Sequence, residues 1–351
     1  NAYPYWADII CDHLGMIWLT SYANGLYIIN PQKETIKNIL PNDKRNEKNL
    51  VLSLIEDQYH NIWMGSPGHI SILDSSRQKI KKITRKQGLN INYPINFFED
   101  SKGDMWTSSF AREINFVSLK NKTITTINAN NGFTGMALAF TEDSNGGIWA
   151  IQKDTIFIFN QQRNAVKNLI INVKIIDPQT GDRGTFFSDK HGNMWVGSVD
   201  RGVLLIDSKG PLPENLDSKN GLIDNNVWGL VEDKNDNIWI STHRGLNIYD
   251  PHKNRLLLLS TKQGLGDDDV RKINEFDKDK IFVSTVSGFS IINTLKKTLN
   301  NYGKEQHLSK YNLMKSVKDD KNQLWLGSLN GIAIYDISKN YLKVINKSTG
   351  L

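Results

Sequence analysis

Two adjacent carboxylates, Glu232 and Asp233, open the stretch EDKNDNIWIST at residues 232–242, and His243 and Arg244 follow it directly. Paired carboxylates beside a histidine are the residue types of general acid–base catalysis, and a turn rich in Asp and Asn could also hold a metal ion. Either chemistry requires the arrangement at one place in the chain. Whether the stretch is repeated therefore decides its meaning.

The stretch recurs along the whole chain. Its other copies are CDHLGMIWLTS (11–21), EDQYHNIWMGS (56–66), EDSKGDMWTSS (99–109), EDSNGGIWAIQ (142–152), SDKHGNMWVGS (188–198), the shorter FDKDKIFVST (276–285) and KDDKNQLWLGS (318–328). The anchors are Trp18, Trp63, Trp106, Trp149, Trp195, Trp239, Phe282 and Trp325, at spacings of 45, 43, 43, 46, 44, 43 and 43 residues. Near-copies in eight units cannot all be one active site, so Glu232 and Asp233 are not an acid–base pair.

Each repeat has the pattern of four short strands. In the sixth, apolar or alternating segments at 226–232, 238–242, 246–250 and 255–260 are separated by polar turns, with no helical period. A four-stranded unit of 40–45 residues is the signature of a propeller blade, which buries its two faces only against neighbouring blades. The predicted fold class is an all-β β-propeller of four-stranded antiparallel blades in eight repeat units.

The repeated Asp and Trp have structural reasons. An Asp at the first position of a turn can accept hydrogen bonds from backbone N–H groups two residues on. A Trp six residues later is a large hydrophobic side chain suited to wedging between neighbouring sheets. The Asp residues are Asp12, Asp57, Asp100, Asp143, Asp189, Asp233 and Asp319. In the seventh unit the turn is one residue shorter and Phe282 replaces Trp, so we expect a weaker blade there.

The number of blades in the ring stays open at this point. The chain holds eight whole repeats in phase, which favours an eight-bladed ring and a single domain over residues 1–351. The alternative is a ring of seven blades with one repeat left over from a longer array.

Composition narrows the class of protein. Of the 351 residues, 39% are hydrophobic and 23% are charged, which suits a large folded core and argues against disorder. The net charge is +6, but the lysines lie singly or in pairs within turns, so nucleic acid is not an expected partner. Cys11, the lone cysteine, forms no internal disulfide.

No apolar run of 18 residues exists, and the sequence starts at Asn1 without a signal peptide, so we expect processing or excision from a longer chain.

The pattern V-x-x-[IL]-x-E-D-x-x-G-N-[IM]-W-[IVL]-G-[ST]-x-x-G-L-x-x-[YI]-D resembles the two-component regulator propeller repeat. Its best matches are residues 227–250, 186–207 and 315–336. The resemblance covers essentially the whole chain. It implies the periplasmic sensor region of a hybrid two-component system from gut Bacteroidetes, which usually holds two seven-bladed propellers and a small β-sandwich. This chain departs from that layout, since it has eight repeats and neither a sandwich, a membrane span nor a kinase.

The resemblance implies a non-catalytic, periplasmic ligand-sensing propeller that recognises an oligosaccharide and relays to a histidine kinase outside this chain. The implied partners are that oligosaccharide, an acidic one being well suited, and the other propeller, sandwich and kinase modules of the same receptor, with a homodimer as an option. Two alternatives remain: a scaffold for protein interactions, and a propeller lyase or glycosidase.

Candidate ligand residues lie in the variable turns. Turns between second and third strands, and links between repeats, vary in sequence, which suits recognition. Aromatic faces stack on sugar rings, and Arg pairs with carboxylate or sulfate. Each such residue could equally be a solvated or packing side chain. The candidates are Tyr22, Phe110, Arg112, Lys153, Arg201, His243, Arg244, Tyr93 and Tyr311, with Asn92, Asn226, Asp268 and Asp269 beside them.

Catalytic and metal signatures are weak. The seven histidines form no H-x-x-x-H pair, and His13, His60 and His191 fall at variable positions of the Asp turns. Asp267, Asp268 and Asp269 could bind a cation but lack the spaced ligands of a calcium loop. The expectation is no catalytic residue, no metal and no cofactor.

Overall fold

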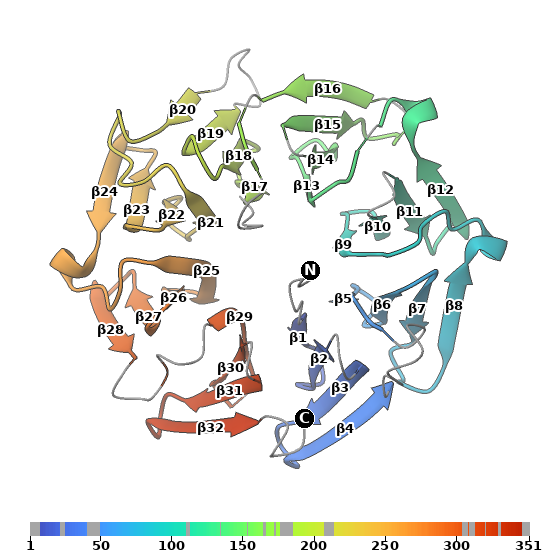
Figure 1. The fold of residues 1–351 in the computed structure, drawn as a ribbon, viewed down its shortest axis with the longest axis horizontal. Helices are drawn as coiled ribbons and strands as arrows, with labels where there is room; N and C mark the ends of the chain where they lie inside the picture. The colour runs from blue at the N-terminus through green and yellow to red at the C-terminus, as the bar shows by residue number, and fades with distance from the viewer. Residues whose placement is uncertain are drawn as a thin grey trace, which may run out of the picture. The chain divides into compact units, whose positions relative to one another are not determined.

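The computed structural model describes residues 8–21, 25–40, 50–109, 113–133, 135–152, 154–163, 166–171, 173–175, 185–206, 214–303, 308, 313–319, 321–328 and 331–345. Within them the chain forms eight antiparallel sheets of four strands each, and every sheet is built from four consecutive strands (Figure 1). The fold class is therefore confirmed as an all-β, eight-bladed β-propeller. The backbone packs into two compact units, residues 1–140 with 315–351 (unit 1) and residues 141–314 (unit 2).

Unit 1 contains the first three blades and the last. Their strands are β1 (Ile9–Cys11), β2 (Ile17–Ser21), β3 (Gly25–Asn30) and β4 (Thr35–Leu40); β5 (Ser53–Glu56), β6 (Ile62–Ser66), β7 (His69–Leu73) and β8 (Ile80–Thr84); β9 (Asn96–Glu99), β10 (Asp104–Ser108), β11 (Ile114–Ser118) and β12 (Thr123–Ile127); and β29 (Leu313–Lys318), β30 (Gln323–Ser328), β31 (Gly331–Asp336) and β32 (Tyr341–Ile345).

Unit 2 contains the fourth to seventh blades, with β13 and β29 crossing the unit boundaries. Their strands are β13 (Ala139–Glu142), β14 (Ile148–Gln152), β15 (Thr155–Phe159) and β16 (Val166–Ile170); β17 (Phe186–Ser188), β18 (Met194–Gly197), β19 (Val203–Ile206) and β20 (Glu214–Leu216); β21 (Val227–Glu232), β22 (Ile238–Thr242), β23 (Gly245–Asp250) and β24 (Arg255–Leu259); and β25 (Val270–Asp277), β26 (Lys280–Thr285), β27 (Gly288–Asn293) and β28 (Thr298–Tyr302).

Burial differs sharply between strand positions in a blade. The second strands are the core: all five residues of β6 and of β22 are buried. The fourth strands are exposed edges, and three of the five residues of β24 face solvent. β6 and β22 both begin with an Ile-Trp pair and lie inside their sheets, whereas β24 is the outermost strand of its sheet and pairs with one neighbour.

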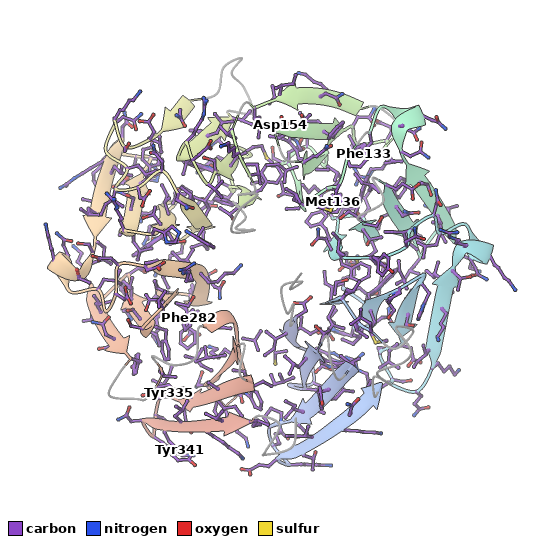
Figure 2. The ribbon with its side chains drawn as sticks, in the orientation of Figure 1. Phe133, Met136, Asp154, Phe282, Tyr335 and Tyr341 are labelled. Carbon is purple, nitrogen blue, oxygen red and sulfur yellow. The ribbon has the colours of Figure 1, made fainter. Side chains whose placement is uncertain are left out.

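Three of the links between blades carry a buried hydrophobic residue. Each of the three begins with a single 3₁₀ turn: η2 (Arg85–Gln87), η3 (Ala129–Asn131) and η4 (Thr261–Gln263). Each ends at a glycine with positive φ, and the next residue is buried: Leu89, Phe133 or Leu265 (Phe133 is labelled in Figure 2). Each of these three links thus has an apolar anchor directly after its 3₁₀ turn. None of the described helices, all single turns, is long and apolar enough to cross a membrane.

In seven of the eight repeats the Asp organises its turn as predicted and also accepts a hydrogen bond from the Trp. Asp12 Oδ1 accepts from the backbone of Leu14 at 3.0 Å and of Met16 at 2.9 Å, while Oδ2 accepts from Trp18 Nε1 at 2.8 Å. The same Trp Nε1–Asp bond, also at 2.8 Å, occurs in the blades of Trp63, Trp106, Trp149, Trp195, Trp239 and Trp325. The conserved spacing of six residues is therefore a hydrogen-bond requirement.

The seventh blade loses the Asp turn and the Trp together. Its first and second strands join through a tight two-residue turn, in which Asp277 pairs with Lys280. Phe282, labelled in Figure 2, is 1% exposed and takes the Trp position. A Phe needs no carboxylate partner, which explains why both features change at once. That this blade is weaker stays a prediction.

The Trp side chains pack against the following blade. Trp63 of the second blade clusters with Met105 and Val117 of the third, and Trp239 of the sixth with Ile273 and Ile281 of the seventh. In unit 1, Trp325 of the last blade packs in the same way on Ile9 and other residues of the first. The last repeat is therefore a full member of the propeller, and the seven-plus-one alternative is excluded.

Candidate functional site

The candidate site in unit 2 starts from two β-bulges. Strand β21 shifts register between Val227 and Gly229, and β25 shifts register between Val270 and Lys272. The residues skipped by the pairing are Trp228 and Arg271, at equivalent places in adjacent blades. Bulges re-aim side chains and are frequent beside functional sites. Each blade thus turns one large side chain out of its regular alternation.

Gly229 allows these two bulges to approach. A Cβ at this position would lie 2.8 Å from Ile273 Cγ2 and 2.8 Å from Ser241 Oγ, closer than packed side chains permit. Strand β21 therefore packs directly on β25. As a result the Arg271 guanidinium lies over the Trp228 ring, 4.8 Å from its centroid, in a cation–π contact.

A histidine and an aspartate complete the cluster. His243, in the β22–β23 turn, packs edge-on against Trp228 with ring centroids 4.8 Å apart. Its Nδ1 lies 3.0 Å from Asp269 Oδ1, and Arg271 Nη2 lies 2.9 Å from Asp269 Oδ2. Asp269 therefore links His243 to Arg271 across two blades. We call Trp228, His243, Asp269 and Arg271 the bulge cluster.

The bulge cluster and the residue beside it contain polar atoms whose hydrogen-bonding capacity is unused. Trp228 Nε1, Arg271 Nε and Asn226 Oδ1 are buried and have no hydrogen-bond partner among the described residues. Buried polar atoms without partners cost about 1–3 kcal/mol each, so they are rare in folded proteins. Such atoms gathered at one bulged place mark it as a site where a polar ligand or water would be stabilised.

Arg244 borders the bulge cluster on its exposed side. Its side chain is 75% exposed, and Nε lies 3.7 Å from Asp224 Oδ2. Its backbone N–H donates to Thr242 Oγ1, which fixes the turn while leaving the guanidinium in solvent. Arg244 is thus the member of this region placed to meet an incoming anionic group.

The predicted ligand residues have different surroundings. His243 and Arg244 lie at the bulge cluster, whereas Arg201 is exposed in the β18–β19 turn, where its N–H donates to Ser198 Oγ. Tyr93, in unit 1, is 38% exposed in the link before β9. The remaining five predictions fall outside the described residues: Tyr22, Phe110, Arg112, Lys153 and Tyr311.

Sequence reasoning missed Trp228 and Arg271. A signal for the first existed, because Trp228 stands eleven residues before the anchor Trp239 and so is a tryptophan the repeat does not require. Arg271 had no comparable signal, since a bulge inserts its extra residue without changing the strand's composition.

The three consecutive aspartates do not converge on one point. Asp267 accepts from Ser287, Asp268 from Thr261, and Asp269 belongs to the bulge cluster. Each carboxylate therefore has its own structural partner.

Comparison with known proteins supports the repeat assignment. Residues 221–244, which include Trp228, His243 and Arg244, match the family model described as "Two component regulator propeller". The chain therefore carries this repeat, which confirms the resemblance at that segment. No curated protein sequence matches the chain.

Solved structures share the fold. The extracellular domain of the hybrid two-component system BT4673 from B. thetaiotaomicron aligns at 18% identity and a TM-score of 0.55, covering 97% of this chain and 48% of that one. A streptogramin B lyase aligns at 15% identity and a TM-score of 0.52, covering 86% of this chain and 95% of that one. The chain thus spans about half the length of the first structure, with which it shares the propeller fold.

Proposed function

We propose that the protein is the ligand-sensing part of a hybrid two-component receptor, that it lies in the periplasm, and that it does not itself catalyse a reaction. The observation that carries the proposal is the coincidence of two features. The segment matching the two-component regulator propeller repeat, residues 221–244, holds four residues at or beside the bulge cluster: Asn226, Trp228, His243 and Arg244. On this proposal, the ligand site lies in the same blade as the segment that matches the family model.

The proposed ligand is an oligosaccharide that carries acidic groups. Arg244 supplies an exposed guanidinium, and Asp269, whose side chain is 29% exposed, supplies carboxylate oxygens that accept from sugar hydroxyls. Because Arg271 covers one face of Trp228, the exposed parts of Trp228 and His243 provide the apolar contact. Binding would shift the arrangement of further propeller, sandwich and kinase modules, or of a dimer, and so bias a histidine kinase outside this chain.

Calorimetry with acidic and neutral oligosaccharides tests this proposal. We expect heat of binding from an acidic member of the panel, and a loss of about tenfold or more in affinity for Arg244→Ala or Trp228→Ala. Tyr59→Ala, which removes an exposed aromatic residue from a β5–β6 turn, is the matched control and should bind normally. Absence of heat with every oligosaccharide, or equal losses in the control, would contradict the proposal.

A second candidate is enzymatic. A histidine held by a carboxylate at 3.0 Å, as His243 is by Asp269, is an arrangement that can act as a general base. Mass spectrometry of each oligosaccharide after incubation with the protein distinguishes the sensor from the enzyme. Turnover abolished by His243→Gln would establish the enzyme; binding with an intact ligand favours the sensor.

A further inference from the structure

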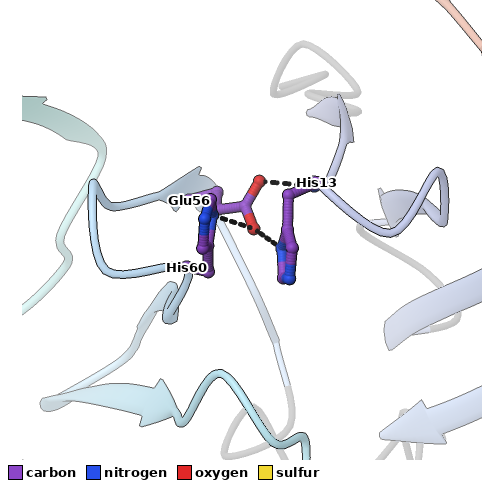
Figure 3. Close-up of side chains that lie close together, drawn as sticks. All are labelled: His13, Glu56 and His60. Carbon is purple, nitrogen blue, oxygen red and sulfur yellow. Dashed lines mark hydrogen bonds and ion pairs between the residues drawn. The ribbon is translucent and has the colours of Figure 1, made fainter.

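A second cluster of chemically active side chains lies in unit 1, where the first blade meets the second (Figure 3). Glu56 ends β5, His13 lies in the β1–β2 turn and His60 in the β5–β6 turn. His13 Nδ1 and Glu56 Oε1 are in direct contact, and His60 Nδ1 lies 3.5 Å from the same oxygen. The two imidazole rings stack, with centroids 3.8 Å apart. Three potential metal ligands thus share one small volume.

These ligands are accessible from solvent. The side chains of His13 and His60 are 27% and 52% exposed, and that of Glu56 is 17% exposed. Glu56 Oε2 is occupied by the backbone N–H of His13 at 2.8 Å, which fixes the carboxylate and leaves Oε1 directed at both rings. An ion can therefore enter without unfolding either turn.

Charge at the cluster is compatible with a cation. Arg77 Nη2 lies 3.3 Å from Glu56 Oε1, but it lies closer, at 2.8 Å, to the fully buried Asp12 carboxylate. Since Asp12 balances Arg77, Glu56 contributes a net negative charge beside two imidazoles.

The backbone of His60 supplies an independent reason to look for a role. At this turn position most repeats have glycine, and His60 stands there with φ of 64°. A left-handed conformation costs a non-glycine residue roughly 1 kcal/mol. The cost of this backbone conformation would be offset if the His60 imidazole, beside a histidine and a carboxylate, bound a ligand.

We propose that His13, Glu56 and His60 bind one zinc ion. Two imidazole nitrogens and one carboxylate oxygen form a donor set that zinc accepts, with a water as fourth ligand. Bond lengths near 2.1 Å in a tetrahedron put donor atoms about 3.4 Å apart. The distance of 3.5 Å from His60 Nδ1 to Glu56 Oε1 already fits this value. Small rotations of the two stacked rings would direct both Nδ1 atoms at the ion and widen the His13–Glu56 contact.

A cluster at the corresponding place in unit 2 has a lysine beside its carboxylates. There His191, Glu232 and Asp236 come together, with Asp236 at the strained turn position. Lys190 Nζ contacts the Asp236 carboxylate directly, so that cluster carries its own cation. In the first cluster no lysine of the described residues pairs with Glu56. Zinc would supply the positive charge there and join the two blades.

Zinc titration of the chelator-treated, tag-free protein tests the proposal. We expect one zinc per chain by calorimetry, and a rise in Tm of about 3–5 °C at a free zinc concentration near 100 times the Kd. His60→Gly removes a ligand while restoring the residue that other repeats use. It should fold with an unchanged or higher Tm without zinc, and lose the zinc-dependent rise.

Two further variants make the result specific. His13→Asn should also abolish the zinc-dependent rise, whereas Asp236→Gly, the matched change in the lysine-filled cluster, should retain it. The proposal is overturned if the wild-type protein shows no zinc-dependent rise, if His60→Gly keeps it, or if Asp236→Gly loses it.

Discussion

At the scale of single residues, one carboxylate does two tasks in each of the seven repeats that have the Asp turn. Asp233 Oδ1 accepts from the turn backbone and Oδ2 accepts from Trp239 Nε1. The first task was predictable, because Asp in a tight turn has few other uses. The second was not, because a spacing of six residues indicates a bond only when the course of the strand after the turn is known.

Substitutions of Trp239 separate packing from hydrogen bonding. Trp239→Ala leaves a cavity between the sixth and seventh blades, and we expect a loss of about 3–5 kcal/mol in the free energy of unfolding. Trp239→Phe keeps most of the packing but removes one of the two hydrogen bonds to Asp233 Oδ2, the other coming from Asn237 Nδ2 at 3.0 Å, for an expected loss of about 1.5–3 kcal/mol. Urea denaturation measures both. Phe282→Tyr is the control, because Phe282 is an anchor residue without an Asp turn. A Trp239→Phe protein as stable as wild type would show that the indole hydrogen bond contributes nothing to the free energy of unfolding.

At the scale of structural elements, neighbouring blades are joined by a glutamate. Glu56 accepts from His13 N at 2.8 Å, Glu99 from Gln58 N at 2.9 Å and Glu232 from Lys190 N at 2.9 Å. Each glutamate ends the first strand of one blade and holds the Asp turn of the preceding blade. The repeated Glu-Asp pair is therefore a joint whose two carboxylates serve different blades.

Strand positions were predictable because the alternation of apolar and polar residues has a period of two, and the strands of the sixth blade agree within a residue. The joint between blades and the bulges at Trp228 and Arg271 depend on how two sheets meet, which local pattern does not encode. This is why the scaffold followed from sequence, whereas of the predicted ligand residues that the structure describes, His243, Arg244, Asn226 and Asp269 lie at the candidate site and Arg201 and Tyr93 do not.

The glutamate joint has a pH dependence that can be measured at Glu99. Burial raises the pKa of the Glu99 carboxyl, and the hydrogen bond from Gln58 only partly offsets this. A raised pKa in the folded state means that the ionised form destabilises the protein above that pKa, and that the penalty disappears as pH falls and the carboxyl is protonated. Glu99→Gln, whose amide oxygen can still accept from Gln58, should therefore raise Tm by about 1 °C at pH 7 and have no effect below about pH 4.

Thermal melts across this pH range check the prediction, with Glu56→Gln as the matched change at the same kind of joint. Glu56 also pairs with Arg77, so its neutralisation should lower Tm at pH 7. A drop of several degrees for Glu99→Gln at pH 7 would instead mean that the charged hydrogen bond outweighs the cost of burial.

At the scale of the whole molecule, each blade is complete within one repeat, since the strands of every sheet are consecutive in the chain. No strand is exchanged between the ends to close the array in the described residues. Contact between the last and first blades in unit 1 is instead made by side chains: Trp325, Ile332 and Ile334 pack on Ile17 and Ile29. Lys343 and Glu34, 3.3 Å apart, add an ion pair at the surface. Sequence alone left the number of blades open because an array of whole repeats is compatible with either ring size.

Removing the last blade tests whether side-chain packing is what holds the first blade in place. A chain ending at residue 314 would expose the apolar face of the first blade, with Ile9, Ile17 and Ile29 now in water. We expect increased binding of a hydrophobic dye, self-association in size-exclusion chromatography and loss of the cooperative melt of the full chain. In the full-length protein, Trp325→Ala removes one side chain from the same contact and should cost about 3–5 kcal/mol, as at Trp239. If the shortened chain stayed monomeric and melted like the full chain, the last repeat would fold independently of the others. The packing of Trp325 on the first blade would then contribute nothing to stability.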